Sequence, residues 1–148
     1  MAATEGAPGQ QTTGGASARA RRVLVIEDET NIAEAIRFIL GRDGWEVSVH
    51  GRGDDALAAV GATAPDLLVL DVMLPGCSGL DVLAALRADP DLAGLPVLVL
   101  TARGRGIDRA VAMAAGADAF LAKPFVNADF LSAVRTLAAP GAAARAAE

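Results

Sequence analysis

Four apolar runs of this sequence each end in a side chain capable of polar chemistry. Two carboxylates follow the first run, and a third carboxylate, a hydroxyl and an ammonium follow the later ones. These side chains are, in chain order, Glu27, Asp28, Asp71, Thr101 and Lys123. Carboxylates brought together where there is little water repel each other and have raised pKa values unless a cation lies between them. The set therefore predicts a bound cation, and all-oxygen ligation favours Mg²⁺.

We expect four residues to hold this Mg²⁺. Asp28 and Asp71 suit direct ligation, Glu27 suits ligation through water, and the backbone carbonyl of Met73 can supply a further oxygen. Mg²⁺ usually keeps several waters and takes only one or two protein carboxylates together with phosphate oxygens. A phosphoryl group is therefore the substrate that this site would hold.

Phosphoryl transfer to Asp71 is the chemistry that the whole set favours. A carboxylate oxygen of Asp71 would attack the donor, and the charge of the metal would offset the charge that develops in the transition state. Lys123 would place an ammonium on the other side of the transferred group, and Thr101 would donate a hydrogen bond to one of its oxygens. Taken singly, an aspartate such as Asp71 at the end of a strand is more often a helix or turn cap than a nucleophile, Thr101 is typical of a cap, and Lys123 is typical of a surface charge.

An alternation of strands and helices has to bring these side chains together. Short apolar runs predict strands over 23–26, 67–70, 97–100 and 119–122, and alternation of apolar and polar residues predicts a strand over 45–50. Amphipathic spacing predicts helices over 32–40, 54–62, 78–87, 111–116 and 127–137. The third and fourth strands are apolar at every position, as is typical of parallel strands buried on both faces. The pattern predicts an α/β fold with an open, doubly wound five-stranded parallel sheet, whose strand carboxyl ends form the binding edge.

Capping residues mark several of the predicted helix ends. Asp54 and Asn127 stand where N-caps are expected, and Ser78 with Asp81 has the spacing of a capping box. Gly116 is placed to end the fourth helix.

The composition indicates one domain with a segment of small residues at each end. Residues 1–20 are almost wholly Ala, Gly, Thr, Gln, Ser and Pro, so we expect a disordered N-terminal segment. Residues 21–139 are long enough for a single domain with its own core. We expect residues 140–148 to form a flexible C-terminal tail.

Charge and hydropathy exclude several classes of function. The formal net charge of −5 provides no basic field, so we expect no direct contact with nucleic acid or with a membrane. The one cysteine, Cys77, excludes an internal disulfide, and no apolar run approaches the roughly 20 residues that a membrane-spanning helix needs. Because no segment resembles a signal peptide, we expect a cytoplasmic protein.

Four segments of the sequence resemble the receiver domain of two-component response regulators. They contain the reactive residues and read VLVIEDE, LLVLDVMLPGCSG, VLVLTA and AAGADAFLAKPF. The resemblance covers about residues 23–137. It implies a flavodoxin-like (βα)5 fold with strand order 2-1-3-4-5, Mg²⁺ binding, and a cis peptide bond before Pro124. It also implies phosphoryl transfer to Asp71 from the phosphohistidine of a sensor histidine kinase or of a histidine phosphotransfer protein.

The resemblance further implies a switch. Thr101 would move toward the new phosphoryl group, and Phe120 would turn inward to fill the space that Thr101 leaves. The surface of the fourth helix, fifth strand and fifth helix would then bind a different protein partner, and a phosphorylation-dependent dimer is one such outcome. By its residue type alone, Phe120 is equally typical of an ordinary core position.

Two other functions compete with phosphoryl acceptance. A phosphorylation-independent, receiver-like interaction module would normally lack an acid, the acceptor or the lysine, whereas all of them are present. An aspartate-nucleophile phosphatase would need a second carboxylate two residues after Asp71, where this chain has Met73. We therefore expect a signalling domain that catalyses only its own phosphorylation and dephosphorylation, either as a stand-alone receiver or as a receiver fragment without an output domain.

Overall fold

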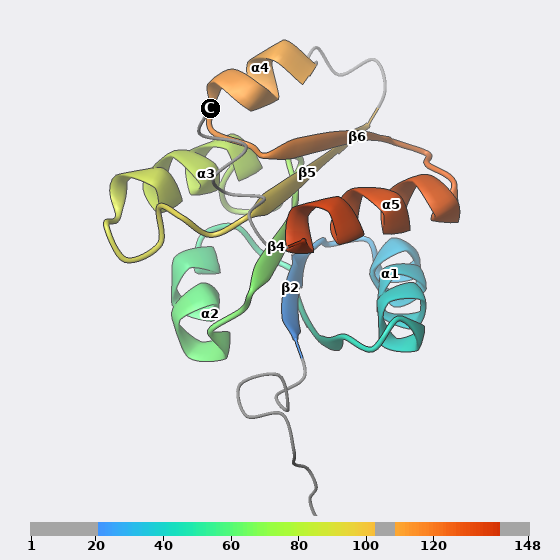
Figure 1. Cartoon of the computed structure of the whole chain (residues 1–148). Helices are drawn as coiled ribbons and strands as arrows, with labels where there is room; N and C mark the ends of the chain where they lie inside the picture. The colour runs from blue at the N-terminus through green and yellow to red at the C-terminus, as the bar shows by residue number, and fades with distance from the viewer. Residues whose placement is uncertain (1–20, 103–108, 140–148) are drawn as a thin grey trace, which may run out of the picture.

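A five-stranded parallel sheet runs through the centre of the protein (Figure 1). The computed structural model describes residues 21–102 and 109–139. Its strands are β2 (Arg22–Ile26), β3 (Glu46–His50), β4 (Leu67–Asp71), β5 (Val97–Ala102) and β6 (Ala119–Lys123). They lie in the order β3-β2-β4-β5-β6, and every neighbouring pair is parallel. In order along the chain this is 2-1-3-4-5, so the predicted doubly wound fold is confirmed.

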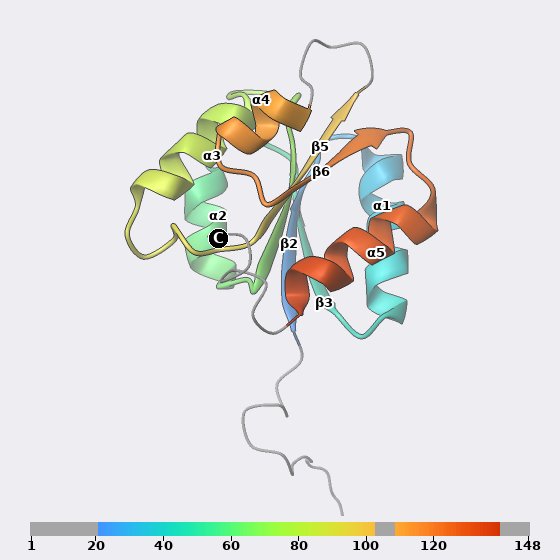
Figure 2. The same cartoon turned by 45° about the horizontal axis from the view of Figure 1, so that its top comes forward.

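Helices cover both faces of the sheet. They are α1 (Thr30–Arg42), α2 (Ala56–Thr63), α3 (Gly79–Ala88), α4 (Arg109–Ala114) and α5 (Asn127–Ala138). Figure 2 shows α1 and α5 on one side of the sheet and α2, α3 and α4 on the other. Each side encloses its own cluster of buried apolar side chains. The reversal of strand order between β2 and β4 puts the first helix and the next three on opposite faces, as right-handed crossovers require.

Strand β4 is the most deeply buried element of the sheet. All five of its residues are buried, and its side chains alternate between the two clusters. Leu67 and Val69 belong to the cluster with α1 and α5, whereas Leu68 and Leu70 belong to the other. Each such side chain contributes about 1.5–3 kcal/mol by leaving water. The continuous apolar run was therefore a correct signal of a strand enclosed on both faces.

Two of the predicted helix ends are confirmed. The Ser78 hydroxyl oxygen accepts a hydrogen bond from the Leu80 N–H at 3.2 Å, which makes Ser78 the N-cap of α3. Gly116, with φ of +112°, follows the last turn of α4. Its N–H donates to the Met113 carbonyl, and the next N–H, of Ala117, donates to the Ala112 carbonyl. This pairing ends a helix where glycine adopts the left-handed conformation.

Two predicted N-caps are wrong. Asp54 does not cap α2, which begins at Ala56, because the Arg52 guanidinium binds both Asp54 carboxylate oxygens at 2.9 and 2.7 Å. A two-point charged contact of this kind is stronger than a cap to a neutral amide. Asn127 is already the first residue of α5, and Val126, in extended conformation, occupies the cap position without a side-chain cap bond.

The predictions for the chain ends lie outside the described residues. These are the disordered segment 1–20 and the flexible tail 140–148. Across residues 21–102 and 109–139, no helix combines the length and apolar character needed to span a bilayer.

Arg87, on α3, holds together the edge of the sheet where β5 and β6 begin. Its Nε donates to the Gly116 carbonyl at 2.9 Å, and its Nη1 donates to the carbonyls of Ala93 and Leu95 at 2.8 and 2.7 Å. Its Nη2 donates to Asp118 at 2.9 Å, within a half-buried ion pair. One guanidinium thus connects α3, the end of α4 and the starts of two strands.

We expect Arg87→Ala to lower the free energy of unfolding by about 2–3 kcal/mol, because the change removes the ion-pair partner of the half-buried Asp118 and the side-chain donor to three carbonyls. Urea denaturation followed by circular dichroism measures the effect. The control is Arg42→Ala, which removes an exposed arginine whose cation–π contact with Phe38 spans 5.5 Å. It should cost about 1 kcal/mol or less. Equal losses in the two variants would contradict a bracing role for Arg87.

Candidate functional site

Asp71 is the last residue of β4 and is 1% exposed. One of its carboxylate oxygens, Oδ1, accepts a hydrogen bond from the Met73 N–H at 3.2 Å. The other, Oδ2, is buried without a hydrogen-bond donor in the described part of the chain. An unpaired buried oxygen is costly and calls for an ion or ligand.

The loop after Asp71 closes tightly on the strand. The Gly79 N–H donates to the Val72 carbonyl at 2.8 Å. A Cβ added at Gly79 would collide with the Asp71 carbonyl oxygen and would lie 2.8 Å from the Val72 Cα. Gly79 thus allows α3 to start directly beside the backbone of Asp71. Only a residue without a side chain permits this approach.

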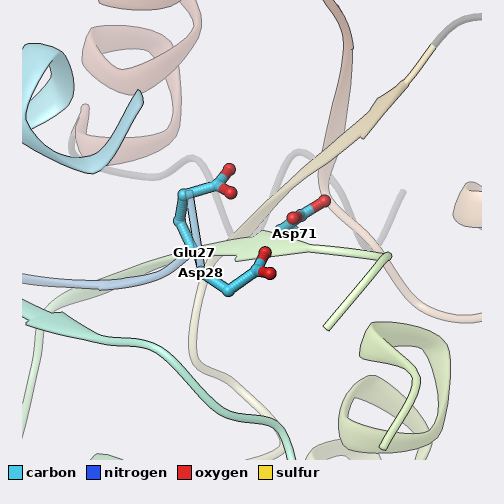
Figure 3. Close-up of side chains that lie close together, drawn as sticks. All are labelled: Glu27, Asp28 and Asp71. Carbon is cyan, nitrogen blue, oxygen red and sulfur yellow. The ribbon is translucent and has the colours of Figure 1, made fainter. Parts of the chain in front are cut away.

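Glu27 and Asp28 follow β2, the strand next to β4. Ile26 pairs in register with Leu70, so the residues that follow each strand emerge side by side. Carboxylate oxygens of Glu27, Asp28 and Asp71 all lie within 4.8 Å of one another (Figure 3). Glu27 is 2% exposed, whereas Asp28 is exposed. The structure therefore brings the three predicted acids together.

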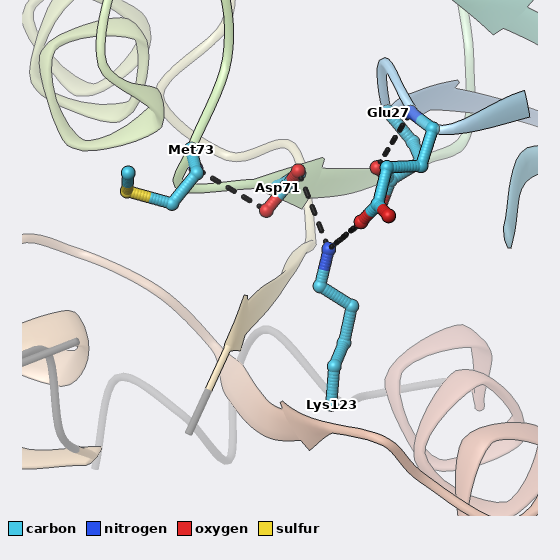
Figure 4. Close-up of polar contacts among 5 residues, drawn as sticks. Glu27, Asp71, Met73 and Lys123 are labelled. Carbon is cyan, nitrogen blue, oxygen red and sulfur yellow. Dashed lines mark hydrogen bonds and ion pairs between the residues drawn. The ribbon is translucent and has the colours of Figure 1, made fainter. Parts of the chain in front are cut away.

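Lys123 reaches this cluster from β6, as Figure 4 shows. Its ammonium lies 3.2 Å from Glu27 Oε1, 3.4 Å from Asp71 Oδ2 and 3.4 Å from Glu29 Oε1. The peptide bond between Lys123 and Pro124 is cis, as the sequence resemblance implied. One ammonium thus faces three carboxylates.

Thr101 is the remaining reactive residue and lies in β5, beside β4. It is 1% exposed, and its hydroxyl has no hydrogen-bond partner among residues 21–102 and 109–139. Asp71 pairs in register with Leu100, so Thr101 is one residue further toward the carboxyl edge.

A family model for the response regulator receiver domain matches residues 23–135 of this chain. The chain belongs to this family. The match covers every reactive side chain described above. Membership of the receiver family agrees with the strand order of this chain and with the cluster of acids at the edge of its sheet.

This receiver is similar to longer bacterial regulators. It is 39% identical over 115 residues to the DNA-binding response regulator MtrA of Mycobacterium tuberculosis, a match that covers 78% of this chain and 49% of MtrA. The chain therefore spans about half the length of the curated relatives it matches.

Solved structures of receiver domains resemble it along their whole length. One is the receiver domain of a signal transduction histidine kinase from Syntrophus aciditrophicus, with a TM-score of 0.74 and 31% identity over 80% of this chain and 90% of that one. Another is the receiver domain of the sensor histidine kinase PA1611 from Pseudomonas aeruginosa. It has a TM-score of 0.73 and 25% identity over 81% of this chain and 98% of that one, and it carries a magnesium ion in its active-site cleft.

Burial dominates the electrostatics of the receiver site. It raises the pKa of Glu27 to about 7, against the effects of the Glu29 N–H and of Lys123. It also raises the pKa of Asp71, although the Lys123 charge and the Met73 N–H oppose the shift. Burial alone would lower the pKa of Lys123, but the charges of Asp71 and Glu27 outweigh it and raise this pKa. The buried acids thus need more positive charge than one ammonium supplies.

The donor set of the receiver fits a hard divalent cation. Its side-chain ligands are all carboxylate oxygens, and Asp71 Oδ2 is a buried acceptor without a donor in the described residues. Such ligands suit Mg²⁺ and not the softer metals that select nitrogen or sulfur. The Met73 backbone adjoins the site, since its N–H contacts Asp71, while ligation by its carbonyl stays a prediction.

Sequence reasoning missed Glu29. This residue has its N–H 3.0 Å from Glu27 Oε2 and its carboxylate on Lys123. The acidic run EDE was visible in the sequence, but only the path of the backbone after β2 turns its third acid toward the lysine. Phe120 is half-buried against the cluster on the side of α2, α3 and α4, which fits a core position and leaves its switching role a prediction.

We expect Asp28→Asn to weaken Mg²⁺ binding by about tenfold or more, because an amide oxygen replaces a charged ligand of the cluster. Isothermal titration calorimetry with MgCl₂ measures the change. Asp91→Asn is the matched control, since Asp91 is an exposed aspartate in the loop between α3 and β5. An unchanged affinity in Asp28→Asn would contradict the predicted ligand set.

We expect Gly79→Ala to lower the free energy of unfolding by about 1–3 kcal/mol, because the added methyl overpacks the backbone of Asp71. The same variant should accept phosphate more slowly, since its acceptor is displaced. The control is Gly94→Ala, where a Cβ would meet nothing within 4 Å. Thermal unfolding and phosphorylation rates of the two variants provide the comparison, and wild-type values for Gly79→Ala would refute the close packing.

Proposed function

We propose that Asp71 accepts a phosphoryl group from the phosphohistidine of a sensor histidine kinase or a histidine phosphotransfer protein, in a reaction that depends on Mg²⁺. The observation that carries this proposal is the state of Asp71 Oδ2. It is a buried carboxylate oxygen without a hydrogen-bond donor in the described residues, and the Lys123 ammonium lies 3.4 Å away. A capping aspartate would have its oxygens paired with backbone N–H groups.

The proposed transfer exchanges one bond to phosphorus for another. A lone pair of Asp71 Oδ2 forms the new O–P bond as the P–N bond to the donor imidazole breaks, and the electron pair of the broken bond stays on the imidazole nitrogen. The Met73 N–H fixes the carboxylate through Oδ1, and the attacking Oδ2 lies 3.4 Å from the Lys123 ammonium. Lys123 and the Thr101 hydroxyl, which has no hydrogen-bond partner in the described residues, would donate hydrogen bonds to oxygens of the transferred group.

The residues proposed to hold Mg²⁺ are Glu27, through water, and Asp28, Asp71 and the Met73 carbonyl. When bound, the ion supplies positive charge that offsets the repulsion between the acids and an incoming phosphoryl group. The raised pKa values of Glu27 and Asp71 support this assignment, because they reveal a shortage of positive charge around the two carboxylates.

The signalling consequence is proposed to be a switch carried by Thr101 and Phe120. Thr101 lies on β5, next to β4, and its hydroxyl has no partner in the part of the chain that the structure describes; Phe120 lies on β6, the strand beside β5. Movement of these two side chains would alter the surface of α4, β6 and α5 and so change its affinity for a protein effector or a second copy of the chain.

We propose residues 21–139 as the receiver unit, acting either alone or as part of a longer regulator. MtrA is named as DNA-binding, and the match covers half of it. For the receiver unit itself we propose a protein partner and no direct nucleic-acid contact, because the chain carries a formal net charge of −5. A phosphorylation-independent interaction module is the alternative function, and the complete set of acids, acceptor and lysine disfavours it.

Incubation with acetyl phosphate and MgCl₂ tests the proposed acceptor. Intact mass spectrometry should show the gain of one phosphoryl group in the wild type, and none in Asp71→Asn or after chelation of Mg²⁺. Asp81→Asn, a change at an exposed aspartate of α3, should be modified like the wild type. An unmodified wild type, or undiminished modification of Asp71→Asn, would refute the proposal.

A further inference from the structure

The Lys123 ammonium is shared among three carboxylates. An ammonium has three N–H donors. Two of its contacts are hydrogen bonds, to Glu27 at 3.2 Å and to Glu29 at 3.4 Å. The third contact is an ion pair with Asp71 Oδ2, also at 3.4 Å. Glu29 thus lies as close to the ammonium as the proposed acceptor does.

Two hydrogen bonds fix the backbone of Glu29 between the Glu27 carboxylate and the start of α1. Its N–H donates to Glu27 Oε2 at 3.0 Å, and its carbonyl accepts the Ala33 N–H at 2.9 Å as α1 begins. Its carboxylate lies on the Lys123 ammonium. Glu29 therefore contacts Glu27, a predicted metal ligand, through its backbone N–H, and it contacts the Lys123 ammonium through its side chain.

The two glutamates differ in how firmly they can hold the lysine. The Glu27 side chain is fully buried, so breaking its ion pair would leave its Oε1 without the opposite charge that faces it in a dry site. The Glu29 side chain is 62% exposed, and water can replace the lysine there. Exposed ion pairs contribute little to stability and are easily exchanged. Glu29 is the contact that Lys123 can release most readily.

We propose that Glu29 is a positioning residue that competes with the acceptor for Lys123 before phosphorylation and so slows phosphoryl transfer to Asp71. This inference rests on the proposed function. Lys123 has to donate a hydrogen bond to an oxygen of the transferred group, and its N–H groups are shared among three carboxylates. The Glu29 contact is the exposed one, so it is the contact that a phosphoryl oxygen would replace on the ammonium.

The proposal predicts that removing the Glu29 carboxylate accelerates phosphorylation. Rates are measured with acetyl phosphate at saturating MgCl₂, so that changes in metal affinity do not contribute. Glu29→Gln should react about 1.5- to 5-fold faster than wild type, which corresponds to the usual strength of an exposed ion pair. A rate equal to or below that of wild type would overturn the proposal.

Two further variants separate the effect of the Glu29–Lys123 contact on the phosphorylation rate from the effect of overall charge. Glu29→Asp keeps the charge but is one methylene too short for the contact, so it should accelerate the reaction as Glu29→Gln does. Glu34→Gln removes the same charge from an exposed position farther along α1, where Glu34 pairs with Arg37 at 3.6 Å, and it should react like wild type. A wild-type rate in Glu29→Asp, or acceleration in Glu34→Gln, would show a charge effect and refute the positioning role.

A spectroscopic measurement tests the contact between Glu29 and Lys123 in the unphosphorylated protein. Lys123 is the only lysine in the sequence, so lysine-selective ¹⁵N labelling gives a single side-chain ammonium resonance. Its chemical shift in the unphosphorylated protein should move in Glu29→Gln and stay unchanged in Glu34→Gln. An unmoved resonance in Glu29→Gln would refute the contact. An unreactive wild type with a resonance that moves would instead refute only the acceptor role of Asp71.

Discussion

One ammonium group balances a cluster of acids at the carboxyl edge of the sheet. Lys123 lies within 3.4 Å of carboxylate oxygens from Glu27, Glu29 and Asp71, two of which are almost fully buried. Buried carboxylates are stable as charges only when positive groups surround them. The cluster remains short of positive charge, because the pKa values of Glu27 and Asp71 are still raised. That shortage is what suits the site to a cation and then to a phosphoryl group.

The strand order places these charged residues next to one another. Strand β4 carries Asp71, the proposed acceptor, between β2, which leads to the other acids, and β5, which carries Thr101. Lys123 comes from β6, one strand further, and its long side chain crosses the gap. Helices on both faces keep water away from the strands, so the charges at the edge interact in a poorly screened environment. The tight turn at Gly79 completes the arrangement by holding the backbone around Asp71.

The two edges of the sheet differ in how completely their polar groups are paired. At the amino edge, Arg87 donates to three carbonyls and to Asp118, which in turn accepts the Val97 N–H. At the carboxyl edge, Asp71 Oδ2 and the Thr101 hydroxyl lack partners among the described residues. Unpaired buried groups reduce stability and persist where a ligand is to be bound. The paired groups at the amino edge thus stabilise the sheet, whereas the carboxyl edge holds the buried polar atoms that are available to a ligand.

The sequence by itself determined the fold class and most of the candidate site, because apolar runs ending in acids, a hydroxyl and a lysine have few alternative arrangements. It did not determine the caps, since Arg52 captures Asp54 and Val126 precedes α5. Nor did it reveal that Glu29 shares Lys123 or that Arg87 joins two helices to two strands. Those contacts join residues whose meeting depends on side-chain direction and loop path. Local patterns fix which elements form, whereas only tertiary packing decides which charges compete for the same partner.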